Sequence, residues 1–475
     1  MKAISLRLAG DAIITNETVS IENPYTRKPF ATVPLCTGEH VEQACAAASA
    51  ALARDDFPQH RRAAVLEKAA GLLAERIDEY AQSITLESGK AITTARVEVA
   101  RCMDTLVFAA AEARRLRGEM VPMEASRAGS GKLAFAVRVP VGVVAAITPF
   151  NFPLNLVAHK LAPAIAAGCP VVLKPAPQTP ITAIKLVNLL MEAGLPEDWI
   201  SVLTDSGREA GAPLTNHATP RMITFTGSAA VGWAIAAGAP KKRVALELGS
   251  NSPVIFEPDT NLDDVVARLK PAAFAGAGQS CISVQRVLVH QSLHAEFLEK
   301  ARLMAEGVVV GDPMDDKTEV GPLIRAREND RVQAWIEEAV NAGGRLITGG
   351  KPQEGLFPPT IVDAVPDDVK LSCQEVFGPV VAVRPYKDFD EALRVANDSE
   401  FGLHCGVFTN DVGKALQAAR RLDFGGVLIN EMPTYRADQQ PYGGVGESGN
   451  TREGPAYTVR EMTELRFISL QAAIS

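Results

Sequence analysis

The sequence predicts an α/β protein with a mainly parallel sheet, built from more than one structural unit. Short apolar runs alternate with helical stretches from about residue 137 to 256, and a second such series extends from about 285 to 430. Strands that alternate with helices form parallel sheets whose faces are covered by the helices. Because 475 residues exceed the usual limit of one hydrophobic core, we expect two or more units.

The first part of the chain is expected to be helical. From Gly38 to about Arg117 it is rich in alanine, and Val41, Ala44 and Ala48 recur at helical spacing. Apolar residues that recur every three or four positions are typical of helices that bury one face. This part therefore predicts a packed set of helices ahead of the strands.

The expected strands follow in order along the chain. They are VRVPVGVVAAIT, CPVVLKP, WISVLT, RMITFTG, RVALELG and SPVIFE in the first series, then QRVLVH, PVVAVRPY and GGVLIN in the second. Helical stretches such as ITAIKLVNLLMEAG separate them. Since the sequence has no tandem repeat and no low-complexity linker, we place the boundary between the units in the turn from Gly249 to Pro253.

Composition and charge exclude several classes of function. The formal net charge is -8 and no basic block occurs, so no nucleic-acid partner is expected. The first residues lack a signal-peptide core, and no apolar run is long enough to span a bilayer, so we expect neither export nor a membrane partner. The 7 cysteines are dispersed without disulfide-type or metal-type spacing, which predicts a cytoplasmic protein without a metal site.

Cys281 is the first candidate for chemistry. It lies in FAGAGQSCISVQRV, where small residues let the backbone approach a ligand and the polar Gln279 and Ser280 flank the thiol. A cysteine among small residues can equally be a buried packing residue. The choice between a nucleophile and a packing residue therefore depends on its neighbours in the fold.

Three further polar residues stand where α/β proteins bind ligands. Glu247 ends the apolar strand RVALE and Lys174 ends VVLK, and open parallel sheets bind ligands at this carboxyl edge. Asn151 lies between Pro149 and Pro153, which hold its backbone and allow its amide to be aimed at an oxyanion. The plain alternatives are an ion-paired carboxylate, a solvated lysine and a turn asparagine.

The segment FTGSAAVG, from Phe225 to Gly232, leads from a strand through a glycine turn into a helix. The first turn of such a helix offers free backbone N–H groups to a pyrophosphate. The segment lacks the complete GxGxxG pattern, so it does not identify a dinucleotide site by itself.

Together these segments resemble the aldehyde dehydrogenase family over essentially the whole chain. The motifs that carry the resemblance are PFNFP, LKPAPQTP, LELGSNSP, GQSC, QEVFGP and PYGGVGESGNTREG. The resemblance implies a doubly wound, parallel-sheet cofactor domain, an α/β catalytic domain and a small oligomerisation β element. It places the first at 1–121 and 141–249, the second at 250–461, and the third at 122–140 and 462–475.

The resemblance also implies an activity and the residues that carry it. Cys281 would attack a small aldehyde, Asn151 and the Cys281 N–H would bind the oxyanion, and Glu247 would activate the water that hydrolyses the thioester. The residues implied to bind the cofactor are Ile147, Thr148, Pro149, Phe150, Lys174, Pro177, Gly207, Gly211, Phe225, Thr226, Gly227, Ser228, Leu248, Gly249, Glu375 and Phe377. Those implied to bind the substrate are Arg101, Ser280, Arg436 and Tyr442.

The cofactor is expected to be NAD or NADP. By resemblance, Lys174 and Glu375 contact its two riboses and Phe377 lies beside the nicotinamide. Many members that prefer NAD carry an acid three positions after the strand-end lysine, where it repels a 2′-phosphate, but this chain has Pro177. We therefore expect activity with both cofactors.

Two arginines bear on the substrate. By resemblance, Arg101 lies on a helix that lines the aldehyde tunnel and Arg436 on the loop that closes it. Paired guanidinium N–H groups bind carboxylates, sulfonates and phosphates, so we expect a short aldehyde with an anionic group or a hydroxyl. The branches that the chain resembles act on lactaldehyde, succinic semialdehyde, phosphonoacetaldehyde, sulfolactaldehyde or glyceraldehyde 3-phosphate.

Both arginines also have a purely structural interpretation. Arg101 could pair with Glu98 or Asp104 on its own helix, as oppositely charged residues three or four positions apart do. Arg436 could pair with Asp438, two positions further along. Each arginine would then stabilise the fold and leave no charge for a ligand.

Other functions remain open beside this one. A CoA-acylating dehydrogenase would transfer the thioester to coenzyme A, but members of that kind often lack the carboxylate that Glu247 provides. A non-catalytic protein on the same fold would be expected to have lost Cys281 or Asn151. A simple cysteine esterase would act without a hydride acceptor.

The C-terminal segment TELRFISL predicts self-association. An apolar strand at the end of a chain needs a partner along its edge. By resemblance it belongs, with residues 122–140, to an element that joins subunits, so we expect a homodimer or a homotetramer. The other cysteines, including Cys102 and Cys169, lie in segments typical of packing and are expected to be dispensable.

Overall fold

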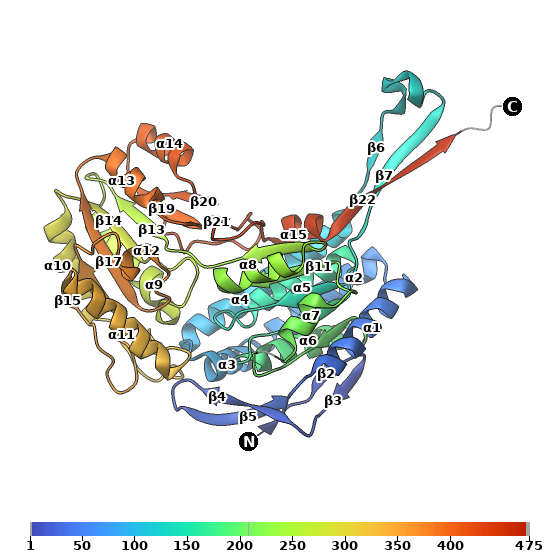
Figure 1. Ribbon diagram of the computed structural model, residues 1–475, viewed down its shortest axis with the longest axis horizontal. Helices are drawn as coiled ribbons and strands as arrows, with labels where there is room; N and C mark the ends of the chain where they lie inside the picture. Colours follow the sequence, from blue (N-terminus) through green and yellow to red (C-terminus); the bar gives the residue numbers. More distant parts are fainter. Residues whose placement is uncertain (1, 208, 472–475) are drawn as a thin grey trace.

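The computed structural model describes residues 2–207 and 209–471. Figure 1 shows two α/β bodies that lie side by side and a long β arm that projects from one of them. Each body has a large hydrophobic core of its own, one drawn mainly from the first half of the chain and the other from residues 254–432. Within the described residues, none of the helices has the length and apolar character needed to cross a membrane.

The first body contains a five-stranded parallel sheet. Its strand order is β10-β9-β8-β11-β12, so the chain winds outward in both directions from the centre. The strands are β8 (Val144–Ile147), β9 (Val171–Lys174), β10 (Ile200–Val202), β11 (Met222–Thr226) and β12 (Arg243–Glu247). The intervening helices are α5 (Asn155–Ala167), α6 (Pro180–Ala193), α7 (Gly211–Asn216) and α8 (Ala229–Gly238). This order confirms the doubly wound fold, and its switch point lies between β8 and β11.

The predicted N-terminal helices are present and pack into the same core. They are α1 (Gly38–Arg54), α2 (Gln59–Ala74), α3 (Ile77–Ser88) and α4 (Ile92–Arg115). Ahead of them lie short strands that the sequence pattern did not predict: β1 (Lys2–Ala3), β2 (Leu6–Leu8), β3 (Asp11–Ile13), β4 (Thr18–Asn23) and β5 (Lys28–Pro34). These short strands cover one end of the body.

The second body contains a seven-stranded sheet in the order β15-β16-β17-β14-β13-β19-β20, parallel except for the pairing of β15 with β16. The chain enters it after β12. Its strands are β13 (Pro253–Phe256), β14 (Arg286–His290), β15 (Arg345–Thr348), β16 (Thr360–Asp363), β17 (Val380–Tyr386), β19 (His404–Phe408) and β20 (Gly426–Ile429). Its helices are α9 (Leu262–Phe274), α10 (His294–Glu306), α11 (Ala326–Asn341), α12 (Lys370–Cys373), α13 (Phe389–Asn397) and α14 (Val412–Arg421). The β18 (Phe401–Gly402) and β21 (Val445–Gly446) strands pair separately.

The arm is a three-stranded antiparallel sheet of β6 (Glu119–Val121), β7 (Lys132–Pro140) and β22 (Thr463–Gln471), with β7 in the centre. The run VRVPVGVVAAIT is therefore two strands rather than one. Its first part belongs to β7 and its second part to β8, because Gly142 breaks the run with a positive φ of 131°. The last helix, α15 (Pro455–Glu461), returns the chain to the first body, where it packs on α4 and α5.

Candidate active site

The carboxyl ends of the parallel strands in the first body face the second body. Strands β8, β9, β11 and β12 end there in Ile147, Lys174, Thr226 and Glu247. Residues of the second body complete two adjoining cavities at this edge. Cys281 lines both cavities, so it stands where they meet.

The loop that carries Cys281 is tightly turned. Asn261 caps helix α9, since its side chain accepts hydrogen bonds from two backbone N–H groups of the first turn. After α9 ends, three consecutive residues, 276–278, adopt positive φ and reverse the chain. A side chain on Gly278 would lie 2.2 Å from the carbonyl oxygen of Gly378, so glycine is required there. This close contact joins the Cys281 loop to the QEVFGP segment.

The larger cavity, of about 1350 Å³, brings together every residue predicted to bind the cofactor. Those residues come from both bodies and from six separate segments of the chain. Helix α11 adds Glu328, Arg331 and Trp335, which the sequence patterns did not single out. The sequence of α11 has the pattern of an amphipathic surface helix, and this pattern does not indicate which of its polar residues face a cavity.

Lys174 has a partner that the sequence analysis missed. Its ammonium lies 2.8 Å from a carboxylate oxygen of the buried Asp205. Asp205 follows β10 and also accepts a hydrogen bond from the Ala210 N–H. Its place at the carboxyl end of an apolar run, in WISVLTDSG, is a signal that could have identified it. The ion pair means that Lys174 offers less free charge to a ligand than the sequence suggested.

Glu375 and Phe377 enter the larger cavity from the second body. Glu375 accepts a hydrogen bond of 2.9 Å from the Ser250 N–H, and burial raises the pKa of its carboxyl to about 7. A side chain on Gly249 would lie 2.3 Å from Glu375, so a glycine there gives the carboxylate its space. The Phe377 ring packs edge to face with Phe150 at 5.8 Å. Together these residues form one wall of the cavity.

The smaller cavity, of about 140 Å³, contains all four predicted substrate residues. Ser280, Arg101, Arg436 and Tyr442 line it together with Cys281 and Asn151. Lys90 also lines it and was not predicted, because nothing in its local sequence distinguishes it from a surface lysine. Its ammonium is ion-paired with Glu98 and lies 3.7 Å from the centre of the Phe152 ring.

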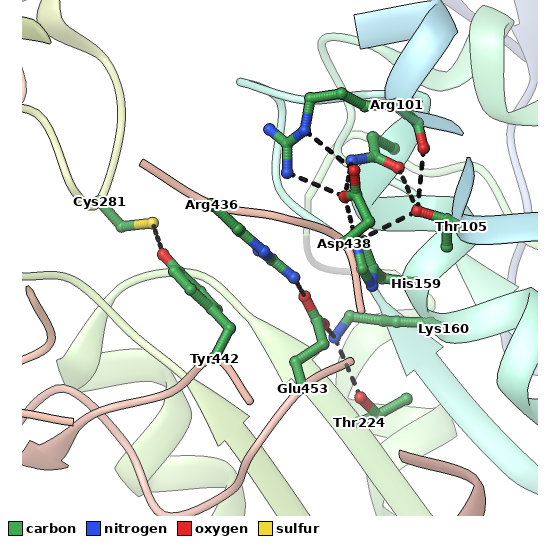
Figure 2. Close-up of polar contacts among 11 residues, drawn as sticks. Arg101, Thr105, His159, Lys160, Thr224, Cys281, Arg436, Asp438, Tyr442 and Glu453 are labelled. Atoms are coloured by element: carbon green, nitrogen blue, oxygen red, sulfur yellow. Dashed lines mark hydrogen bonds and ion pairs between the residues drawn. The ribbon is translucent and has the colours of Figure 1, made fainter. Parts of the chain in front are cut away.

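The structural interpretations of the two arginines named the wrong ion-pair partners. Arg101 does not pair within its helix but forms two hydrogen bonds, of 2.9 and 3.2 Å, with Asp438. Arg436 pairs with Glu453 at 2.8 Å rather than with Asp438, whose carboxylate His159 and Arg101 already occupy. Figure 2 shows both pairs together with the contact between Cys281 and Tyr442. Residues distant in sequence hold both guanidinium groups, so spacing along one helix or loop could not reveal them.

Two groups contact the segment of the nucleophile. The Tyr442 hydroxyl lies 2.8 Å from the Cys281 sulfur, and the Asn151 amide donates a hydrogen bond of 2.8 Å to the Gln279 carbonyl. That bond uses one N–H of the amide and leaves the second for a ligand. Burial raises the pKa of Cys281 to about 12, whereas the Tyr442 hydrogen bond and the Arg436 charge lower it.

Glu247 lies beside this site but lines neither cavity. It is 3 % exposed, and neither carboxylate oxygen has a hydrogen-bond partner among the described residues. Burial and then the negative charge of Glu453 raise its pKa well above the ordinary value. A side chain on Gly443 would lie 2.8 Å from a carboxylate oxygen of Glu247, so glycine at this position leaves space for the carboxylate.

The fold and the site together define a nucleotide-dependent α/β enzyme. Its cysteine lies between a cavity large enough for a cofactor and a smaller cavity lined by cationic side chains. The model of the aldehyde dehydrogenase family matches residues 13–468. The chain belongs to the aldehyde dehydrogenase family. It is therefore an oxidoreductase that oxidises an aldehyde, with NAD or NADP as the cofactor.

Among known proteins, the chain is 46% identical to a 3-sulfolactaldehyde dehydrogenase from Priestia aryabhattai, over 99% of this chain and 98% of the other. It is 37% identical to a lactaldehyde dehydrogenase from Methanococcus maripaludis, over 96% of this chain and 97% of the other. Both similarities extend over nearly the whole length of each protein. They agree with the predicted resemblance to these branches.

Two solved structures are also similar. Aldehyde dehydrogenase 21 from Physcomitrella patens, in complex with the product succinate, superposes with a TM-score of 0.96 and 39% identity, covering 100% of this chain and 99% of the other. Glyceraldehyde-3-phosphate dehydrogenase from Methanocaldococcus jannaschii, in complex with NADP, has a TM-score of 0.92 and 38% identity, covering 96% and 100%. The α/β fold is therefore that of the family.

The larger cavity fits a nicotinamide dinucleotide. Helix α8 begins at its wall after Gly227 and Ser228, and the first N–H groups of a helix have no partner within it. Gly207 and Gly211 line the same cavity, and a side chain on Gly211 would approach Lys174 to 3.5 Å. Both apolar side chains and polar ones such as Lys174 and Glu375 line this cavity at the switch point of the sheet, which is where such folds bind dinucleotides.

Proposed function

We propose that the protein oxidises a short anionic aldehyde to its carboxylic acid through a thioester on Cys281. The observation that carries this proposal is the smaller cavity, where Lys90, Arg101 and Arg436 stand around the cysteine. None of the residues that line this cavity is acidic, and all of them lie in the described part of the chain. Each cation is paired with a carboxylate that does not line the cavity, so the cavity presents their N–H donors without an acidic side chain, which favours an anionic ligand over an apolar one.

The substrate that these findings favour is a three- or four-carbon aldehyde with a sulfonate or carboxylate group, and sulfolactaldehyde is the leading candidate. The similar Priestia protein is a 3-sulfolactaldehyde dehydrogenase, and the similar Physcomitrella patens enzyme is in complex with its reaction product succinate. Asp438 and Glu453 hold the two arginines from one side. Arg436 Nε has no partner among the described residues, which leaves a buried donor for the anion.

The proposed mechanism begins with the Cys281 thiolate. It adds to the aldehyde carbon, and the second N–H of Asn151 and the Cys281 N–H stabilise the new oxyanion, each contributing about 3 to 4 kcal/mol in comparable sites. The Gln279 carbonyl orients the Asn151 amide for this task. When bound, NAD or NADP supplies the hydride acceptor.

Glu247 completes the reaction. After the thioester has formed, its carboxylate takes a proton from water, and the hydroxide attacks the thioester carbon and releases Cys281 and the acid. Because Glu247 lines neither cavity in this structure, its side chain must turn toward Cys281 for this step. The presence of this carboxylate supports hydrolysis over transfer to coenzyme A.

The direct test is a panel of aldehydes with the purified protein, followed by the appearance of reduced cofactor. Sulfolactaldehyde, succinic semialdehyde, lactaldehyde, phosphonoacetaldehyde and glyceraldehyde 3-phosphate would be compared with propanal and benzaldehyde. We expect the highest kcat/KM among the anionic aldehydes. A higher kcat/KM for propanal or benzaldehyde would contradict it, and ester hydrolysis without cofactor reduction would indicate an esterase.

Replacement of Arg101 by methionine tests the role of the cationic cavity. We expect kcat/KM for the anionic aldehydes to fall about 10- to 100-fold, the loss of one charged hydrogen-bonding interaction, with kcat/KM for propanal within about twofold. Arg96→Met is the matched control, since Arg96 lies on the same helix and pairs with Asp78 and Asp316 outside the cavity. Equal losses for propanal and the anions would show that Arg101 acts through the fold.

The cofactor preference is tested by Pro177→Glu. Pro177 lines the larger cavity near the Lys174–Asp205 pair, and a carboxylate there would repel a 2′-phosphate. We expect the wild type to use both cofactors and the variant to lose about tenfold in kcat/KM with NADP relative to NAD. Pro177→Gln supplies the same shape without charge. If both variants behave alike, charge at position 177 does not decide the preference.

We also propose that the chain works as a homodimer or a homotetramer. Among the described residues, strand β22 pairs with β7 along one edge only, and Leu465, Phe467 and Leu470 on it are more than half exposed. A second subunit that covers this arm would remove these apolar side chains from water. We also propose the domain limits given above and a location in the reducing cytoplasm. We propose no nucleic-acid partner.

A further inference from the structure

Tyr442 stands directly against the reactive sulfur. Its hydroxyl oxygen lies 2.8 Å from Cys281 Sγ, and its side chain is 2 % exposed. Its backbone forms a bridge with Glu453, with N–H to carbonyl hydrogen bonds in both directions. The two hydrogen bonds of this bridge therefore hold the backbone of Tyr442 in place.

The Tyr442 ring is packed between two other side chains. The Arg436 guanidinium carbon lies 3.7 Å from the ring centre, and the His404 ring meets it edge to face at 5.0 Å. Glu453 pairs with Arg436 at 2.8 Å, so the backbone partner of Tyr442 also fixes the cation over its ring. Figure 2 shows Glu453, Arg436, Tyr442 and Cys281 in succession.

We propose that Tyr442 is a catalytic residue that donates its hydroxyl hydrogen to the Cys281 thiolate, with Arg436 and Glu453 as its positioning residues. This inference rests on the proposed role of Cys281. It assigns to Tyr442 the stabilisation of the nucleophile before the aldehyde arrives, in addition to any contact with substrate. Hydrogen bonds to an ionised acceptor are about twice as strong as those between neutral groups, so this one favours the thiolate over the thiol.

The charged and titratable groups around Cys281 make such a donor necessary. Tyr442 and Arg436 favour the thiolate, whereas burial, Glu375 and Glu247 oppose it. Burial keeps the pKa of Tyr442 well above its ordinary value, so its hydroxyl retains the hydrogen that it donates. Burial also lowers the pKa of His404 to about 4, so this neighbour is uncharged at neutral pH. Arg436 is then the cation that faces the tyrosine ring.

Tyr442→Phe removes the donor and keeps the ring. We expect the pH midpoint of Cys281 ionisation to rise by about one unit, which corresponds to the loss of one charged hydrogen bond. The thiolate fraction below the midpoint would fall about tenfold. Because a more basic thiolate is also a better nucleophile, alkylation at neutral pH would slow by only about threefold.

The measurement is the rate of Cys281 alkylation by iodoacetamide against pH, followed by mass spectrometry of the peptide, without cofactor or aldehyde. The ultraviolet absorbance of the thiolate gives its fraction independently. The work uses a Cys373→Ser background, since Cys373 is the one exposed cysteine. Tyr386→Phe is the matched control, because the Tyr386 hydroxyl is buried against Phe256 and Glu257 away from both cavities.

A second variant, Arg436→Gln, tests the positioning of the ring. If Arg436 acts on Cys281 partly through Tyr442, the variant with both Tyr442→Phe and Arg436→Gln will show a smaller decrease in the logarithm of the thiolate fraction than the sum of the decreases in the two single variants. Full additivity would remove Arg436 from this role. Thiolate fraction and alkylation rate in Tyr442→Phe equal to those of the wild type would overturn the whole inference.

These readouts separate the two proposals. Alkylation does not require turnover, so an unchanged Tyr442→Phe profile would leave the proposed oxidation intact. Retained oxidation in a Cys281→Ala variant would instead remove the proposed function, whatever Tyr442 does. Thermal unfolding of each variant shows whether it is folded. If Tyr442→Phe does not fold, the alkylation profile of Arg436→Gln is compared with that of the wild type instead.

Discussion

Replacement of Cys281 by alanine is expected to abolish aldehyde oxidation. Removing the nucleophile from an enzyme that forms a covalent intermediate lowers the rate by about a million-fold in comparable cases. Here neither hydride departure nor thioester formation can begin without the sulfur, so even the first turnover should be missing. The measurement is reduced cofactor in a rapid-mixing experiment, at enzyme concentrations that make a single turnover visible.

The remaining cysteines provide the controls for this experiment. Cys102 and Cys169 are fully buried in the first core, and Cys373 is exposed outside both active-site cavities. Alanine at each of these positions should leave kcat/KM within about threefold, although a smaller side chain in the core lowers stability. Residual oxidation by Cys281→Ala that equals any of these variants would remove Cys281 from its assigned role.

The fold and the positions of the site residues could be predicted because they follow the periodicity of the chain. Strands such as β9 and β13 are entirely buried, so they appear in the sequence as apolar runs bounded by a polar residue, Lys174 at the end of β9 and Glu257 directly after β13. Parallel strands bring their carboxyl ends to one edge of the sheet, so the sequence assigns Lys174 and Glu247 to that edge. The resemblance then supplied the loops from the second body.

The ion pairs within the site could not be predicted. Asp438 receives Arg101 and His159, and Glu453 receives Lys160, from elements hundreds of residues away, whereas Arg436 reaches Glu453 from 17 residues away. A carboxylate in a loop gives no sign of which cation it meets, because the pairing depends on how the two bodies pack. The alternatives based on local spacing were wrong for this reason.

The Tyr442–Cys281 contact has the same origin. The sequence placed Tyr442 near the substrate, but its contact with the sulfur depends on two loops that approach from separate parts of the second body. The hidden position of Glu247 was likewise unforeseen, since a residue at a strand end can face a cavity or turn behind it. Strand periodicity predicts where a residue lies along the sheet and does not predict its rotamer.

Glu247→Gln is expected to separate the two halves of the reaction. Acylation of Cys281 does not use the carboxylate, so the variant should still give a rapid burst of reduced cofactor, close to one equivalent for each active site. The deacylation that follows should be about 100- to 10,000-fold slower, the usual contribution of a general base. Rapid mixing resolves the burst, and mass spectrometry of the quenched enzyme should find the acyl group on Cys281.

The pH dependence of the steady-state rate is an independent test of the role of Glu247. A general base acts only when deprotonated, and burial with the charge of Glu453 raises the pKa of Glu247 well above its ordinary value. The steady-state rate of the wild type should therefore rise with pH through this elevated value, because each step upward increases the carboxylate fraction. The amide of Glu247→Gln does not titrate, so its slow deacylation should lack that rise. A variant that keeps both the wild-type steady state and its pH profile would show that water is activated by another group.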